Sequence, residues 1–299
     1  MIELIFGAIA LFYLPRLIKS LCSFYRRYTF ITKLPGPKAL PLLGNVLDFG
    51  KDSFDSGQFL IRAGNEELAK GNNIMRIWVG GRVLVVPLNG EALKPILDST
   101  EEITKGSDYD FIIPWLGIGL LISTGSKWKS RRRMLTPTFH FAMLDGYVEK
   151  MDKHSKVLVD ILEENVGKEI DIYPFIKRCA LDIICDTAMG TELNSQHDPT
   201  QLYVRTVGDF NTLARDYSLN PINWFPPYWY LTGQHKTYTE MVKILTDFTK
   251  QVIADRITAH EQGELTFEET NGKRKAFLDM LIEMKANNSL TSEDIREEV

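Results

Sequence analysis

This sequence contains few cysteines and no excess of positive charge. The first feature argues against disulfide-rich and zinc-binding proteins, and the second against general nucleic-acid binders. The three cysteines, Cys22, Cys179 and Cys185, include no C-x-x-C spacing, so neither a disulfide framework nor a zinc site is predicted. Lysine and arginine total 35 against 39 for aspartate and glutamate, a formal net charge of -4. General nucleic-acid binders are usually basic, so no nucleic-acid partner is expected.

Disorder and repeat architecture are excluded as well. Hydrophobic residues make up 44% of the chain and charged residues 25%, which are values of globular proteins. The 299 residues are enough for one large domain or two ordinary ones. Strand-like patterns are rare, and apolar side chains recur mostly at helical spacing. The predicted fold class is therefore mostly α with a small β-sheet.

The longest uncharged apolar run stands at the N-terminus. Residues 4–14 are too few to span a bilayer, since a transmembrane helix needs about 20 apolar residues. The longer stretch over residues 2–25 would span if Arg16 and Lys19 extend to the lipid headgroups. We therefore predict a membrane anchor over residues 1–25, with a signal peptide and a buried core helix as alternatives. Positive charges follow the run, which predicts that the rest of the chain faces the cytosol.

A hinge and a hairpin follow the predicted anchor. Residues 26–45 are predicted to be a basic and proline-rich hinge. Proline fixes φ and removes a backbone donor, so the part over residues 34–45 is predicted to be an extended spacer. In the globular part, residues 46–299, two β-rich runs flank the dipeptide Gly80-Gly81. That pattern predicts a β-hairpin.

Two aromatic or apolar segments are predicted to be loops. Residues 111–123 are apolar and punctuated by glycine, which suggests a loop that packs against other apolar groups. Residues 221–230, PINWFPPYWY, are rich in aromatic side chains. Ordinary packing and contact with a membrane interface are both open for this second segment.

The last residues resemble the beginning of a helix. Thr291 and Asp294 have the spacing of a capping box, which marks a helix N-terminus. No glycine, proline or basic stop signal follows before Val299. We therefore expect the chain to be a fragment of a longer protein.

The stretch SKWKSRRRMLTPTFHF, residues 126–141, carries the strongest chemical signal. In a helix that ends near Leu135, before Pro137, Trp128 and Arg132 share one face. The indole N–H and the guanidinium are both donor-only groups, and together they suit an anionic oxygen of a carboxylate or phosphate. A surface cation–π pair is the alternative.

The same residues resemble a known family. Trp128 and Arg132, followed by LTPTFHF, resemble the C-helix signature of the cytochrome P450 haem-thiolate monooxygenases. The segments LPGP, IMRIWVGGRVLVV, CALDIICDTAMG, KRKAFLDMLIEM and LTSEDIREEV follow the order of that family. The resemblance covers the whole chain and is strongest to family 4, in particular its insect members.

The resemblance implies a fold, a cofactor and a site. The fold would be the N-terminal portion of the cytochrome P450 fold, with residues 46–299 as an incomplete haem monooxygenase domain. Trp128 and Arg132 would hold a haem propionate, and Leu116 and Leu121 are candidates for the pocket of a small apolar substrate.

The resemblance also implies the activity of the complete enzyme. It would hydroxylate fatty acids, hormones or xenobiotics such as insecticides with O2 and with electrons that a reductase takes from NADPH. It would lie in the endoplasmic reticulum (microsomal) membrane, in contact with the lipid bilayer, and its catalytic domain would face the cytosol.

Several family features are missing from the sequence. The oxygen-activating acid and threonine and the glycine-rich loop with the haem-ligating cysteine are not found, and none of the three cysteines has glycine two residues later. Glu293 and Arg296 match the family's E-x-x-R by letter but in the wrong segment. We therefore expect an N-terminal fragment that ends before the central oxygen-activating helix, has no catalytic residue or metal ligand of its own, and is inactive alone. Cys179 and Cys185 are predicted to be small core residues.

One further hypothesis remains from the residues themselves. The chain could be a non-enzymatic, membrane-tethered helical module in which Arg132 and Trp128 form a surface cation–π pair.

Overall fold

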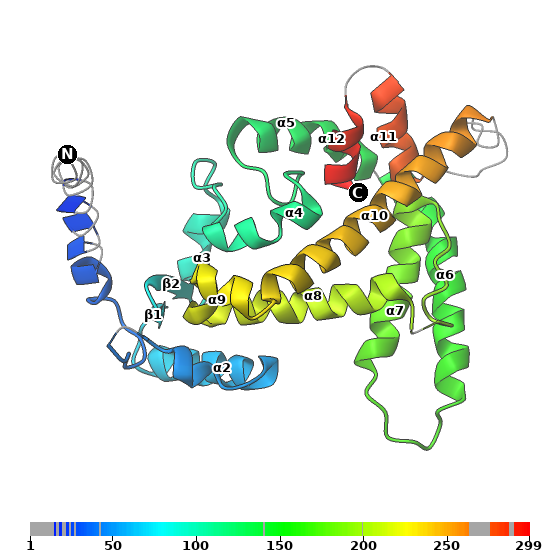
Figure 1. Cartoon of the computed structure of the whole chain (residues 1–299). Helices are drawn as coiled ribbons and strands as arrows, with labels where there is room; N and C mark the ends of the chain where they lie inside the picture. The colour runs from blue at the N-terminus through cyan, green and yellow to red at the C-terminus, as the bar shows by residue number, and fades with distance from the viewer. Residues whose placement is uncertain are drawn as a thin grey trace. The chain divides into compact units, whose positions relative to one another are not determined.

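The computed structural model confirms a mostly helical chain with a small antiparallel sheet (Figure 1). The residues that it describes are 15, 18–19, 22–23, 25–26, 28–41, 43–139, 141–198, 200–262, 276–286 and 290–299. Most of the predicted anchor lies outside them. Within the described part, no helix combines the length and the apolar character that crossing a bilayer requires. The chain divides into two compact units, Met1–Glu102 with Arg215–Pro226 and Ile103–Ala214 with Pro227–Val299.

The first unit is built around the predicted hairpin. β1 (Ile74–Val79) pairs antiparallel with β2 (Arg82–Pro87). Gly80 at the turn has a φ of 55°, a left-handed conformation that glycine adopts at little cost. Helices α2 (Ser53–Ala69) and α3 (Gly90–Leu97) flank the hairpin in sequence. The buried core of this unit consists of Phe49, Phe59, Ala63, Met75, Ile77 and Val79.

The proline-rich segment docks onto β1 and turns back on itself between Leu40 and Gly44, which form an isolated β-bridge. The backbone N–H of Arg76 donates to the carbonyl oxygen of Pro35 at 2.7 Å. Asn45 is fully buried, and its side-chain oxygen accepts from the N–H of Trp78 at 3.1 Å. An edge strand offers unpaired backbone groups, and the segment bonds to some of those of β1, so it lies against the hairpin instead of acting as a free spacer.

From residue 103 onward the described chain is almost entirely helical. Here η marks short 3-10 segments, except η4, which is a π-helical turn. The elements are η2 (Ser107–Phe111), α4 (Ile113–Leu116), α5 (Gly125–Leu135), η3 (Thr136–Phe139), α6 (Phe141–Glu163), α7 (Tyr173–Ile184), η4 (Cys185–Met189), α8 (Leu202–Leu219), η5 (Pro221–Trp224), α9 (Pro226–Leu231), α10 (Gln234–Glu261), α11 (Phe277–Ala286) and α12 (Ser292–Glu298).

The core of the second unit gathers side chains from α5, η4, α10, α11 and α12. Its buried members are Leu135, Cys185, Met189, Val252, Ile253, Leu278, Leu281, Ile282, Leu290 and Ile295. Cys185 is 1% exposed and Cys179 is 5% exposed. Both thiols are therefore small core residues, as predicted.

The predicted loop at residues 111–123 contains one turn of helix, α4. Pro114 stands at its start, where a missing N–H costs nothing, and Gly117 ends it with a φ of 69°. Trp115 packs on Phe210 with ring centroids 4.9 Å apart. Phe111 lies 4.7 Å from the ring of Tyr238. The expected packing against apolar groups is therefore confirmed, although the segment is partly helical.

The aromatic segment at residues 221–230 is also helical, in η5 and α9, and not a loop. Trp229 is buried, with its ring 6.4 Å from that of Tyr238. The indole N–H of Trp224 donates to the carbonyl oxygen of Tyr217 at 2.7 Å. Packing thus explains the two tryptophans, and membrane contact by this segment stays a prediction. Its exposed apolar side chains are Ile222, Phe225 and Tyr230.

Candidate functional site

Helix α5 carries the predicted anion-binding pair. It ends at Leu135, as predicted, although Thr136, before Pro137, keeps helical φ and ψ of -54° and -41° and begins the 3-10 turn η3. Trp128 and Arg132 lie one turn apart on this helix, with the guanidinium carbon 6.0 Å from the centre of the indole ring. The two side chains therefore share a face.

The three consecutive arginines of α5 have different environments. The Arg131 side chain is 12% exposed and forms ion pairs with Asp294 and Glu298 of α12. Arg132 and Arg133 are exposed, and no described carboxylate pairs with either. Successive residues of a helix turn by about 100°, so the run cannot act as one charged surface. Arg132 keeps its donors available beside the indole.

One cavity of about 590 Å3 is lined by all four residues that the sequence suggested, Trp128, Arg132, Leu116 and Leu121. Its volume lies within the range of about 300–1,000 Å3 that is usual for small-molecule sites. The complete lining belongs to the second unit. The other lining residues are Lys105, Trp115, Gly119, Leu120, Ile122, Leu135, Tyr203, Thr249, Phe277, Arg296, Glu297, Glu298 and Val299.

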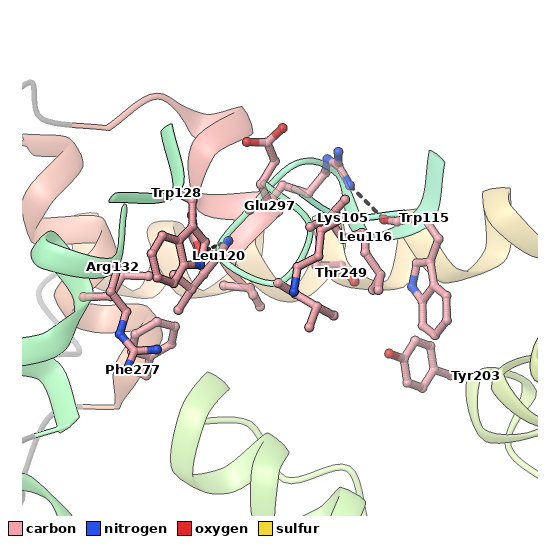
Figure 2. Close-up of a pocket in the computed structure, with 17 residues that line it drawn as sticks. Lys105, Trp115, Leu116, Leu120, Trp128, Arg132, Tyr203, Thr249, Phe277 and Glu297 are labelled. Carbon is pink, nitrogen blue, oxygen red and sulfur yellow. Dashed lines mark hydrogen bonds between the residues drawn. The ribbon is translucent and has the colours of Figure 1, made fainter. Parts of the chain in front are cut away.

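The cavity has a polar side and an aromatic side. Figure 2 shows Trp128 and Arg132 together on one side and Trp115 and Tyr203 on the opposite side. Between them the end of α4 and the segment after it supply an apolar wall. In this wall Leu116 is half-buried, and Leu121, 59% exposed, stands at the rim. The two leucines therefore differ in how far they are withdrawn from solvent.

Several lining residues were not found by sequence reasoning. Lys105 adds a second cation to the lining, and its ammonium lies 5.5 Å from the ring centre of Tyr109. Tyr203 stacks on Phe248 at 4.1 Å, and burial raises its pKa to about 12. Thr249 comes from α10. No local pattern distinguishes these residues, because they meet only through tertiary packing.

The pair Glu293 and Arg296, which matches E-x-x-R by letter, is a local contact of α12. The two side chains form an ion pair at 2.6 Å with i,i+3 spacing, and Glu293 is 62% exposed. Arg296 also donates to the carbonyl oxygen of Trp115 at 3.0 Å. Thr291 and Asp294 form the predicted capping box at the start of the same helix.

None of the three cysteines lines the cavity. Cys22 is exposed, whereas Cys179 and Cys185 are free and buried. Burial, reinforced by nearby carboxylates, raises the pKa of the Cys185 thiol to about 12, and burial also raises that of Cys179. Only the thiolate is a good metal ligand, so neither buried thiol is prepared to bind a metal ion.

The chain is similar to known proteins along most of its length. The profile of the family described as Cytochrome P450 matches residues 34–299. The chain is 35% identical over 296 residues to cytochrome P450 4V2 of Rattus norvegicus, which covers 96% of this chain and 56% of that protein. It is 35% identical over 296 residues to cytochrome P450 4c3 of Drosophila melanogaster, with 92% and 54% covered.

A second insect relative gives a similar result. Cytochrome P450 4c21 of Blattella germanica is 32% identical over 280 residues, 91% of this chain and 55% of that protein. The relatives thus include vertebrate and insect proteins with family 4 names. The chain spans about half the length of the curated relatives it matches.

Proposed function

Because the chain belongs to the cytochrome P450 family, we propose that it forms the haem-propionate side and part of the substrate pocket of a membrane-bound haem-thiolate monooxygenase. The observation that carries this proposal is the single cavity shared by Trp128, Arg132 and the leucines at residues 116 and 121. It joins anion-binding donors to an apolar wall, which is the combination that an amphipathic cofactor and an apolar substrate require.

The residues present fit the carboxylate side of a haem. Trp128 and Arg132 offer donors and no acceptor, and a guanidinium can bind a carboxylate with two parallel hydrogen bonds. Haem carries a second propionate, and Lys105 is the further lining cation for which the described chain shows no carboxylate partner. We assign one propionate to Trp128 and Arg132 and propose Lys105 for the other.

When bound, haem with a thiolate ligand supplies the cleavage of O2. The residues of this chain bind its carboxylates, line the pocket and exclude water around an apolar substrate. Electrons would come from NADPH through a reductase, one oxygen atom would enter the substrate and the other would leave as water. Fatty acids, hormones and xenobiotics are the proposed substrate classes.

The iron ligand is proposed to be a cysteine other than the three in this chain. Cys179 and Cys185 are buried in the core, their pKa values are raised, and neither lines the cavity. The chain alone is therefore proposed to be inactive.

Attachment to the endoplasmic reticulum membrane is part of the proposal. Its support is the uncharged run at residues 4–14 with positive charges after it. Limited proteolysis of intact microsomes tests it: we expect the globular part to be digested from the cytosolic side. Full protection of the globular part would show that the proposed orientation is wrong.

Substitution of Arg132 tests the propionate assignment. In the protein that carries this chain, Arg132→Leu is expected to lower the haem-to-protein ratio of the purified protein. Removing a hydrogen bond to a charged group costs about 1.5–3 kcal/mol, which is roughly a tenfold or greater loss of haem affinity. Arg133→Leu is the matched control, because Arg133 is an equally exposed neighbour that does not line the cavity.

The two variants separate the competing functions. Loss of haem from Arg132→Leu alone supports the assignment. Equal haem content in both variants would contradict it, and a protein that binds no haem at all would favour the non-enzymatic helical module with a surface cation–π pair.

A further inference from the structure

Two pieces of the cavity wall are held together by a third element, helix α12. The first piece is the short loop Gly117–Leu120, which follows α4, and the second is helix α5 with Trp128 and Arg132. Helix α12 lies beside both, although it comes about 170 residues later in the chain (Figure 1). Its carboxylates make the contacts.

Glu297 and Glu298 each connect one loop amide to one cation of α5. The carboxylate of Glu297 accepts from the N–H of Ile118 at 3.0 Å and from the ammonium of Lys127 at 2.7 Å. The carboxylate of Glu298 accepts from the N–H of Leu120 at 2.9 Å and lies 3.5 Å from Nε of Arg131. Two adjacent residues of α12 thus form two parallel bridges.

The parallel arrangement fixes more than one bridge could. A single bridge would let the loop rotate about one contact. Here the bridged amides are two residues apart, and Lys127 and Arg131 are four apart, one turn of helix. Both the position of the loop along α5 and its rotation are therefore set.

The loop approaches α12 so closely that only glycine fits. A Cβ added to Gly119 would lie 1.9 Å from the backbone oxygen of Glu297, and one added to Gly117 would lie 2.6 Å from its Cγ. The carboxylates themselves are withdrawn from water, with 11% of the Glu297 side chain and 2% of the Glu298 side chain exposed. Buried carboxylates are tolerated only with donors, so these contacts are not incidental surface pairs.

We propose that Glu297 and Glu298 are positioning residues that hold the Gly117–Leu120 loop and helix α5 at a fixed separation across the cavity. The loop is the apolar wall and α5 is the cationic side, so the pair sets the width of the pocket that an apolar substrate enters. This inference rests on the proposed function for what the pocket binds, but the contacts that carry it do not depend on haem.

Hydrogen exchange of the haem-loaded protein that carries this chain tests the positioning role. In Glu297→Ala and Glu298→Ala, the amides of a peptide over residues 115–121 are expected to exchange about tenfold faster or more, since each loses a hydrogen bond to a charged group. Peptides from α7 should keep their protection. Glu297→Gln should restore most of the loop's protection, because its amide oxygen still accepts from Ile118.

Two controls separate positioning from general destabilisation. Glu293→Ala removes a carboxylate from the same helix. Among the described ion pairs this carboxylate contacts only Arg296, so the hydrogen exchange of the loop should stay unchanged. Gly119→Ala should loosen the loop by steric conflict alone, whereas Gly106→Ala meets no atom within 4 Å and should not. Equal effects of Glu293→Ala and Glu297→Ala, or equal loss of protection in α7, would overturn the inference.

Substrate kinetics provide the functional readout. Loosening the pocket wall should raise KM for an apolar substrate about threefold or more while kcat changes less, because positioning is lost and not chemistry. An unchanged KM with a loosened loop would overturn the assignment of pocket width. The protein could also fail to bind haem while the loop still exchanges faster in Glu297→Ala and Glu298→Ala. That result would confirm the contacts of the two glutamates and would contradict the proposed function.

Discussion

At the scale of single residues, neighbouring arginines of α5 have different partners because the helix points them in different directions. Arg131 is committed to the carboxylates of α12, whereas Arg132 lines the cavity beside Trp128. The sequence predicts that the arginines point apart, because a helix turns by about 100° per residue. It does not predict which one pairs with α12, because Asp294 lies 163 positions away.

Cys185 provides a test at the same scale. Cys185→Ala is expected to lower the free energy of unfolding by about 1–2 kcal/mol, since a fully buried side chain is shortened in a packed core. It should leave the haem content and the carbon monoxide spectrum of the protein unchanged, because burial holds the thiol protonated, with a pKa of about 12, and the thiol does not line the cavity.

Chemical denaturation and the reduced carbon monoxide spectrum of the same preparation measure the two effects. Cys179→Ala is the matched control, another buried thiol outside the cavity. A thiolate-type band that disappears in Cys185→Ala but survives in Cys179→Ala would identify Cys185 as the iron ligand and contradict the assignment.

At the scale of elements, a buried ionic cluster joins α6 to the π-helical turn η4. The carboxylate of Asp186 lies 2.7 Å from the ammonium of Lys150 and 3.0 Å from Nε2 of His154. Burial works against ionisation of Asp186, but hydrogen bonds from Lys150 and His154 outweigh it, so its pKa falls below the ordinary 3.8. The free energy of unfolding is therefore expected to depend on pH through the carboxyl group of Asp186.

Asp186→Asn is expected to lower the free energy of unfolding by about 2–3 kcal/mol at neutral pH, because it leaves Lys150 without its charge partner. A lowered carboxyl pKa stabilises the folded state above the unfolded value of 3.8, and this contribution is lost as the pH falls through the lower folded value. The difference between the variant and the natural protein should therefore shrink below pH 3.8.

Urea unfolding at a series of pH values measures this difference. Asp152→Asn is a suitable control, because Asp152 forms an exposed i,i+4 pair with Lys156 and such pairs contribute little. A difference between Asp186→Asn and the natural protein that stays constant down to acid pH would contradict the role of the ionised carboxylate.

Elements with local signals could be predicted, and those that depend on distant contacts could not. The hairpin follows from Gly80-Gly81 between two β-rich runs, and the end of α5 follows from Pro137. The turn of helix in α4 was missed, because the glycines after Leu116 suggest a loop. Docking of the proline-rich segment onto β1 was missed as well, since its partners are backbone groups that carry no sequence signal.

At the scale of the whole chain, the cavity is assembled from segments that span residues 105–299. The sequence supplied its four named residues through a short motif and a family resemblance. Tyr203, Thr249 and Phe277 could not be predicted, because only the packing of α8, α10 and α11 brings them to the same space. Motifs therefore point to the residues of the proposed cofactor side, whereas the remaining wall of the cavity is a property of the fold.

The final prediction concerns the chain as it stands. Expressed as residues 30–299 with haem supplied, then reduced and treated with carbon monoxide, it should show no thiolate-type absorption band and no monooxygenase activity. Trp128 and Arg132 would contribute one propionate contact, which is about 1.5–3 kcal/mol, but the iron needs an axial ligand to define its chemistry. Both buried thiols lie outside the cavity lining, so neither can supply that ligand without rearrangement of the core. A normal thiolate-type band would show that Cys179 or Cys185 reaches the iron, and it would overturn both the ligand proposal and the placement of the haem in this cavity.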